Sequence, residues 1–101
     1  MPYAFIQDVP ANEPMYREIR AMLPSEPPDG MVAHLVIKRD TGLQYVDVWA
    51  TEADWTRFRD DHVEPAVRAV LTGHGITHDH SMVSSQPIEI IDAWLGAESP
   101  G

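Results

Sequence analysis

The sequence predicts an α+β fold, in which helices cover one face of an antiparallel sheet and the elements follow the order β, α, β, β, α, β. The prediction rests on four short stretches rich in apolar, β-branched and aromatic residues, on two stretches with apolar residues at helical spacing, and on turn-forming residues between them. Of the 101 residues, 44% are hydrophobic and 23% are charged, as is typical of one folded domain. We expect this domain to span residues 1–96 and residues 97–101 to form a frayed tail.

The first two elements are a strand over Tyr3–Val9, closed by Pro10, and a helix capped by Asn12. The apolar residues of this helix recur at helical spacing and therefore share one face; they are Met15, Tyr16, Ile19, Met22 and Leu23. Three prolines and a glycine over residues 24–30 end the helix and predict a connecting loop.

The next two strands, Met31–Ile37 and Leu43–Trp49, form a predicted hairpin. The first of them is apolar at odd and even positions alike, which is typical of a strand that is covered on both faces. Two helices cover only one face of a sheet, so the other face would expose a large apolar patch. We therefore expect two copies of the chain to pack sheet to sheet as a homodimer.

The length of the hairpin loop decides whether His34 and Asp47 share a face, because a shift of one residue moves every side chain to the opposite face. A two-residue loop, Asp40–Thr41, places His34 directly across from Asp47. A three-residue loop with Gly42 in a left-handed conformation places His34 across from Val48 instead. Glycine at the third loop position favours the three-residue loop.

A second helical region follows, which Thr51 opens as a cap and on which Trp55, Phe58 and Val63 form the inward side. Because Pro65 cannot donate a backbone hydrogen bond, we expect a break over residues 61–64. A short helix over Pro65–Leu71 should follow, ended by Gly73.

The C-terminal part begins with the polar segment Ile76–Gln86, which predicts a loop or a weak extended arm. The apolar stretch Ile88–Leu95 is then the predicted last strand. With both helices on one face, the complete order is that of a ferredoxin-like fold.

Charge and composition exclude several classes of function. Seven basic against sixteen acidic residues give a net charge of −9, which repels nucleic acid and anionic membrane surfaces. There is no cysteine, so disulfides, thiolate nucleophiles and cysteine-bound metals are excluded. With neither a secretory signal nor an apolar span of membrane length, we expect a cytoplasmic protein.

The strand end Val46–Trp49, the cap Thr51–Glu52 and the aromatic pair Trp55 and Phe58 resemble the dimeric α+β barrel superfamily, in particular its antibiotic biosynthesis monooxygenase-like group. Members of that group often end this strand with an acidic, an apolar and an aromatic residue before a capped helix. The resemblance implies a homodimer with one aromatic-lined pocket per subunit, between the sheet and its helices. Where the group often has a histidine on this helix, this chain has Phe58, and the fold hosts enzymes and non-enzymes alike.

His34 and Asp47 are the candidate catalytic residues. His34 interrupts an apolar strand, where a titratable group is costly to bury without a partner; a hydrogen-bonded core histidine is the structural alternative. Tyr45, Asp47 and Trp49 alternate and share one face of the sheet. With Trp55 and Phe58 they predict an apolar pocket that contains a carboxylate and a phenol, and core packing is the alternative.

Two further residues are candidates for substrate binding. Gln7 lies near the end of the first strand, and His62 lies near the end of a helix; a strand leaving the sheet and a solvated surface are the respective alternatives. His74, His78 and His80 form the one metal-like cluster, but the last two lie on a predicted loop without a rigid scaffold, so we expect no metal site.

Two functions follow from these residues. In the first, a cofactor-independent, monooxygenase-like enzyme acts on a small aromatic or polyketide-like compound: His34 or Asp47 removes a proton, Tyr45 and Trp49 orient the substrate, and oxygen attack or rearrangement follows. In the second, the chain is a non-catalytic homodimeric module that binds a hydrophobic ligand such as haem.

Overall fold

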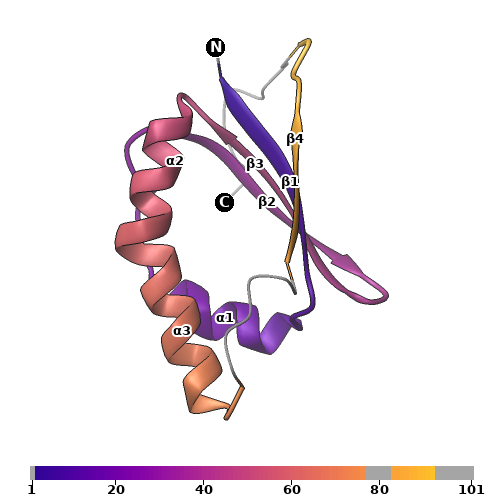
Figure 1. Cartoon of the computed structure of the whole chain (residues 1–101), viewed down its shortest axis with the longest axis vertical. Coiled ribbons are helices and arrows are strands. Elements are labelled where there is room, and N and C mark those ends of the chain that lie inside the picture. The colour runs from indigo at the N-terminus through magenta and orange to yellow at the C-terminus, as the bar shows by residue number, and fades with distance from the viewer. Residues whose placement is uncertain (1, 77–82, 93–101) are drawn as a thin grey trace.

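Four strands form one antiparallel sheet in the order β2-β3-β1-β4 in the computed structural model, which describes residues 2–76 and 83–92 (Figure 1). This is the sheet order of the predicted ferredoxin-like fold. The strands are β1 (Tyr3–Val9), β2 (Met31–Arg39), β3 (Gly42–Trp49) and β4 (Ser84–Ile88).

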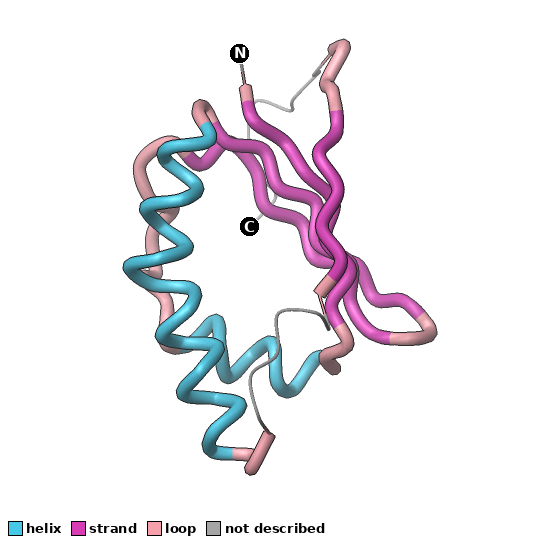
Figure 2. Tube along the Cα trace, viewed as in Figure 1, coloured by secondary structure: helices cyan, strands magenta, loops and turns pink. Residues whose placement is uncertain are grey.

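All of the helices lie on one face of this sheet (Figure 2). They are α1 (Glu13–Ala21), α2 (Glu52–Phe58) and α3 (Glu64–Gly73). The predicted caps are confirmed: the Asn12 side chain accepts a hydrogen bond from the Met15 backbone at 2.9 Å, and the Thr51 hydroxyl accepts one from the Asp54 backbone at 3.1 Å. No helix of the described residues is long and apolar enough to cross a membrane.

The predicted helix break is a π-helical turn, Arg59–Val63, that joins α2 to α3. The backbone N–H of Glu64 donates to the carbonyl of Arg59, five residues earlier. The helix predicted from Pro65 is present as α3, but it begins one residue earlier, and the π-helical turn joins it to α2 without a gap. Because Pro65 lies in the first turn of α3, where an N–H has no partner within the helix, it is accommodated without ending the helix.

The prediction for the last strand is also wrong. The strand is Ser84–Ile88, whereas residues 89–92 are not extended into the sheet, and residues 93–95 lie outside the described part of the chain. β4 is an edge strand paired with β1, and a proline, Pro87, is tolerated there because an edge strand has one side without a neighbour. Its mostly exposed, polar sequence lacks the apolar pattern of a core strand.

The loop between β2 and β3 has two residues, so the favoured three-residue loop is wrong. Arg39 pairs with Gly42, and His34 lies directly across from Asp47. Gly42 is required for a different reason: a side chain there would collide with the backbone carbonyl of Val9 on β1. A bulge between Met31 and Ala33 interrupts the alternation of side chains at the start of β2, so that Met31 pairs with Trp49 whereas Ala33 pairs with Val48.

The helix-facing and outer faces of the sheet differ in burial. On the helix side, Phe5, Trp49 and Phe58 form the buried core. On the outer side, two apolar residues of β2 are exposed, Leu35 by 57% and Ile37 by 37%. β2 is thus apolar on both faces, but in this chain the helices cover only one of them (Figure 1).

Candidate functional site

A cavity of about 720 Å³ lies between the sheet and the helices, in the size range of small-molecule sites. One face of α1, the loop after it, strands β2 and β3, and the helix α2 contribute to its walls. Its apolar lining includes Ile19, Leu23, Met31, Val36, Trp55, Phe58, Val63 and Val67, and its polar lining includes Gln7, Tyr16, Arg20, Glu26, His34, Tyr45 and Asp47.

A histidine and a carboxylate meet on this wall because they pair across the hairpin. His34 Nδ1 lies 2.7 Å from Asp47 Oδ1, with Asp47 only 3% exposed. A buried carboxylate accepts hydrogen bonds and does not donate them, so Nδ1 carries the proton that is shared with Asp47. In a neutral imidazole, Nε2 is then an acceptor.

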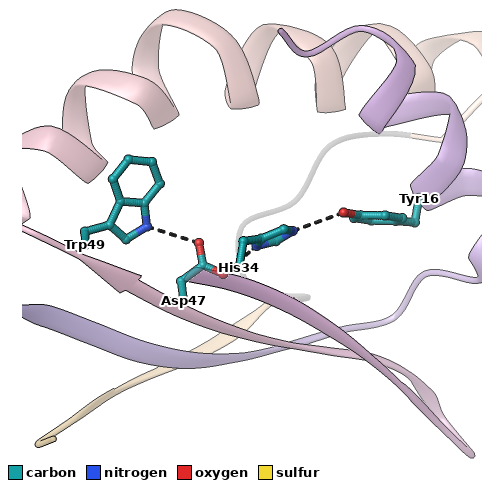
Figure 3. A network of polar contacts seen from close by, with 4 residues as sticks. All are labelled: Tyr16, His34, Asp47 and Trp49. Atoms are coloured by element: carbon teal, nitrogen blue, oxygen red, sulfur yellow. Dashed lines mark hydrogen bonds and ion pairs between the residues drawn. The ribbon is translucent and has the colours of Figure 1, made fainter. Parts of the chain in front are cut away.

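Two more residues extend this pair into a chain of four (Figure 3). The Trp49 indole N–H donates to the other carboxylate oxygen of Asp47 at 3.1 Å. On the opposite side, the Tyr16 hydroxyl lies 3.0 Å from His34 Nε2, to which it donates in this protonation state. Tyr16 comes from α1, so the contact joins the helix to the sheet.

The two tyrosines of the cavity are held in their neutral form. Burial raises the pKa of Tyr45 to about 12, with further contributions from Tyr16 and the Asp47 charge. Burial likewise raises the pKa of Tyr16, and the nearby Arg20 and Arg17 charges oppose that rise. Both phenols are therefore hydrogen-bond donors at neutral pH and not phenolate bases.

The rings around His34 fix its orientation. The Tyr45 ring lies edge-on to the imidazole at a centroid distance of 5.6 Å, and the Tyr16 ring lies end to end with it, with the ring planes 25° apart and the centroids 6.2 Å apart. Together with the bond to Asp47, these contacts leave the imidazole one favoured position. The arrangement is an oriented base at the wall of a largely apolar cavity.

Neither a protein-family model nor a curated protein matches the sequence, but solved structures match the fold. Rv0793 from Mycobacterium tuberculosis superposes with a TM-score of 0.59 at 17% identity, over 92% of this chain and 98% of that one. NE2512 from Nitrosomonas europaea, a protein of unknown function, gives 0.61 at 17% identity over 96% and 95%. The structure of an antibiotic biosynthesis monooxygenase gives 0.58 at 16% identity over 91% and 100%. The chain has the antibiotic biosynthesis monooxygenase-like fold.

The resemblance inferred from the strand end and the capped helix is thus confirmed for the fold. Within this monooxygenase-like fold, identities near 17% carry no information about substrate or reaction, so the chemistry has to come from the site itself.

The structure brings most of the predicted site residues to the cavity. Besides His34 and Asp47, the lining contains Gln7, Tyr45, Trp55 and Phe58. Trp49 is fully buried beneath the cavity wall, where it holds Asp47. The exposed His62 lies beside Phe58, with the two rings tilted and their centroids 5.3 Å apart, and it is not among the lining residues.

Three polar lining residues, Tyr16, Arg20 and Glu26, were not singled out as site residues from the sequence. Tyr16 was assigned to the apolar face of its helix, which is the face that lines the cavity. The sequence feature that could have identified Tyr16 is its phenol, because a hydroxyl on the apolar face of a helix needs a hydrogen-bond partner. Arg20 follows one turn later and shares this face.

The histidine cluster is only partly described. His74 Nε2 lies 2.8 Å from Glu18 Oε2 and joins the end of α3 to α1. His78 and His80 lie outside the described residues. Among residues 2–76 and 83–92, no group of three or more ligating side chains is placed to hold a metal ion.

Proposed function

We propose that the chain is a cytoplasmic, homodimeric, cofactor-independent enzyme, monooxygenase-like in its chemistry, that acts on a small aromatic or polyketide-like compound. One observation carries the proposal: the His34 imidazole is bonded to the buried carboxylate of Asp47 at the wall of a cavity large enough for such a compound. An imidazole that a carboxylate partner holds in one orientation is suited to act as a general base.

In the proposed mechanism, His34 Nε2 accepts a proton from an acidic C–H or O–H of the substrate. Asp47 keeps the proton on Nδ1 and stabilises the imidazolium that forms, and Trp49 holds Asp47 in place. Because Tyr16 donates to Nε2, the substrate either displaces its hydroxyl or passes its proton through it. Tyr45 and Gln7 supply polar contacts that orient the substrate.

The carbanion formed by deprotonation of a methylene then reacts with dioxygen, which is both the oxidant and the source of the new oxygen atom. A C–O bond forms, the peroxide takes up the proton held by His34, and the O–O bond breaks as the second C–H proton is lost. One oxygen atom leaves as water and the other becomes a carbonyl. The protein supplies the base, the orientation and an apolar site that excludes water.

Oxygen uptake in the presence of anthrone tests this proposal, because anthrone is a tricyclic compound with an acidic methylene. The wild-type chain should consume one dioxygen per anthraquinone formed. The variant His34→Gln should lose at least about 100-fold in rate, the usual contribution of a general base. His62→Gln is the matched control and should keep the rate. Equal rates for all three proteins would refute the assignment.

The homodimer is supported by the outer face of the sheet. Leu35 and Ile37 are exposed there, next to Val46 and Val48 on the neighbouring strand. Covering such a face with a second copy removes apolar surface from water at about 25 cal/mol per Å². Sedimentation should therefore give twice the monomer mass, and the double variant Leu35→Glu, Ile37→Glu should sediment as a monomer; a wild-type monomer at micromolar concentration would contradict the proposal.

A non-catalytic module for a hydrophobic ligand is the second candidate, and the apolar majority of the lining residues favours it. Within this alternative, haem fits poorly, since both ring nitrogens of His34 already have partners. A pure binder would take up anthrone without consuming oxygen.

A further inference from the structure

The helix α1 has an apolar face but no buried residue. Tyr16, Ile19, Arg20 and Leu23 are all only partly buried, and all four line the cavity at the spacing of one helix face. In most amphipathic helices this face packs against the core. Here it faces the cavity, so a bound molecule would take the place of core side chains.

Arg20 is the one arginine or lysine among the described lining residues. Its guanidinium donates one hydrogen bond, from Nη1 to the Pro24 carbonyl at 2.9 Å, which fixes it to the proline-rich loop at the cavity rim. No carboxylate of the described residues lies within ion-pair distance of it, although the protein has sixteen acidic side chains.

Two other helical arginines, Arg17 and Arg57, differ from Arg20 in this respect, and Arg68 on α3 is exposed and does not line the cavity. Arg17 pairs with Glu13 on α1, and Arg57 pairs with Asp54 on α2. Arg17 is close in sequence to Arg20 but does not line the cavity. A half-buried guanidinium with most of its five N–H donors available is suited to a carboxylate, which it binds through two parallel hydrogen bonds.

We propose that the cavity binds an aromatic carboxylate, with the carboxylate on Arg20 and the rings between α1 and the aromatic side chains Trp55 and Phe58. This inference rests on the proposed function and names its substrate class. The anchor and the base then lie at separate points: Arg20 follows Tyr16 by four residues, about 6 Å along the helix axis. Because Arg20, Tyr16 and His34 line the same cavity, one molecule anchored on Arg20 can extend toward the other two residues.

Calorimetric titration with 2-naphthoate and with its neutral analogue 2-naphthamide tests the proposal. The wild-type chain should bind naphthoate at least about tenfold more tightly than naphthamide, as expected for a charged hydrogen bond. Arg20→Gln should remove this preference and leave naphthamide binding unchanged, which also shows that the variant's cavity is intact. Arg17→Gln removes the same charge from the same helix and should change neither affinity.

Each other result overturns the inference: equal binding of the two probes by the wild type, equal losses in Arg20→Gln and Arg17→Gln, or no binding of either probe. His34→Gln, titrated alongside, separates this inference from the proposed function. If naphthoate binding depends on Arg20 but anthrone oxidation does not depend on His34, the anion site stands and the base assignment fails. If the reverse holds, the base assignment stands and the anion site fails.

Discussion

The two ends of the helix–sheet interface differ in what fills them. Beneath α2, the rings of Phe5, Trp49, Trp55 and Phe58 pack at centroid distances of 4.9 to 5.6 Å, and three of the four residues are buried. Beneath α1 there is a cavity and a chain of polar contacts, and the residues of this helix are at most partly buried. The first end stabilises the fold, whereas the second leaves space and oriented polar groups for a ligand.

Asp47 and Trp49 connect the two ends. They are two residues apart on β3, and one bond between their side chains joins the aromatic cluster to the polar chain. A rigid aromatic core thus supports the position of Asp47, which in turn orients His34. Substitutions that act only at the aromatic end or only at the cavity end can therefore test whether the two ends have different roles.

The largest expected effect is on stability, at the aromatic end. Trp49→Ala removes a fully buried ring and the donor to Asp47, and should lower the free energy of unfolding by about 3 to 5 kcal/mol. Ile19→Ala, at the cavity end, should cost less than about 1.5 kcal/mol because Ile19 is only partly buried. Urea unfolding measures both, and similar losses would remove the distinction between the two ends.

The next effect is on activity, at the polar end. Asp47→Asn keeps the shape of the side chain but allows it to donate to His34, which favours the wrong tautomer. Anthrone-dependent oxygen uptake should fall about 100-fold. If activity is retained, the carboxylate does not orient the base. Far-UV circular dichroism should show a folded chain.

A smaller effect concerns alkaline pH. Below pH 10, Tyr45 is protonated in both the folded and the unfolded chain; between pH 10 and 12 the unfolded chain ionises first, because the folded pKa is about 12. Stability should therefore fall as pH rises through this window, by about 1 to 2 kcal/mol more in the wild type than in Tyr45→Phe. Urea unfolding at pH 9 and at pH 11.5 gives the difference, and identical losses in both proteins would contradict a raised pKa.

The smallest effect compares the two helix caps. Thr51→Ala should lower the global free energy of unfolding by about 1 kcal/mol, since α2 belongs to the core. Asn12→Ala removes the same kind of bond from α1. Because α1 has no buried residue, we expect local opening of this helix, so the variant should instead speed amide exchange in α1 with a smaller global loss. Equal global losses would mean that α1 is as firmly docked as α2.

Local signals predicted much of this fold. The predicted first strand and the predicted starts of both helices agree with the structure. Their signals are Pro10, Asn12 and Thr51, each of which acts on its own backbone or on the nearest turn. Gly42 led to the wrong loop length because the reason for a glycine there is not local. A side chain at this position would collide with the backbone of β1, and rules for hairpin loops do not include contacts with a third strand. β4 was missed because its pairing with β1 depends on main-chain groups and not on an apolar pattern.

The site was predictable only in its parts. The sequence singled out His34 and Asp47 as chemically conspicuous residues, but their meeting depended on a loop length that sequence rules assigned wrongly. The role of Tyr16 could not be predicted without knowing how close α1 lies to β2. From the sequence, the helical spacing of Tyr16 indicates only a core position. A cavity, unlike a strand, has no local sequence pattern.

The most direct test of the central claim, that His34 is an oriented base at a ligand cavity, is proton exchange without oxygen. Anthrone in deuterated buffer under argon should exchange its methylene protons faster with the wild-type chain than in buffer alone, as followed by NMR. His34→Gln should return the rate to that of the buffer, and His62→Gln should not. Exchange by His34→Gln at the wild-type rate, or no acceleration by the wild type, would contradict the account.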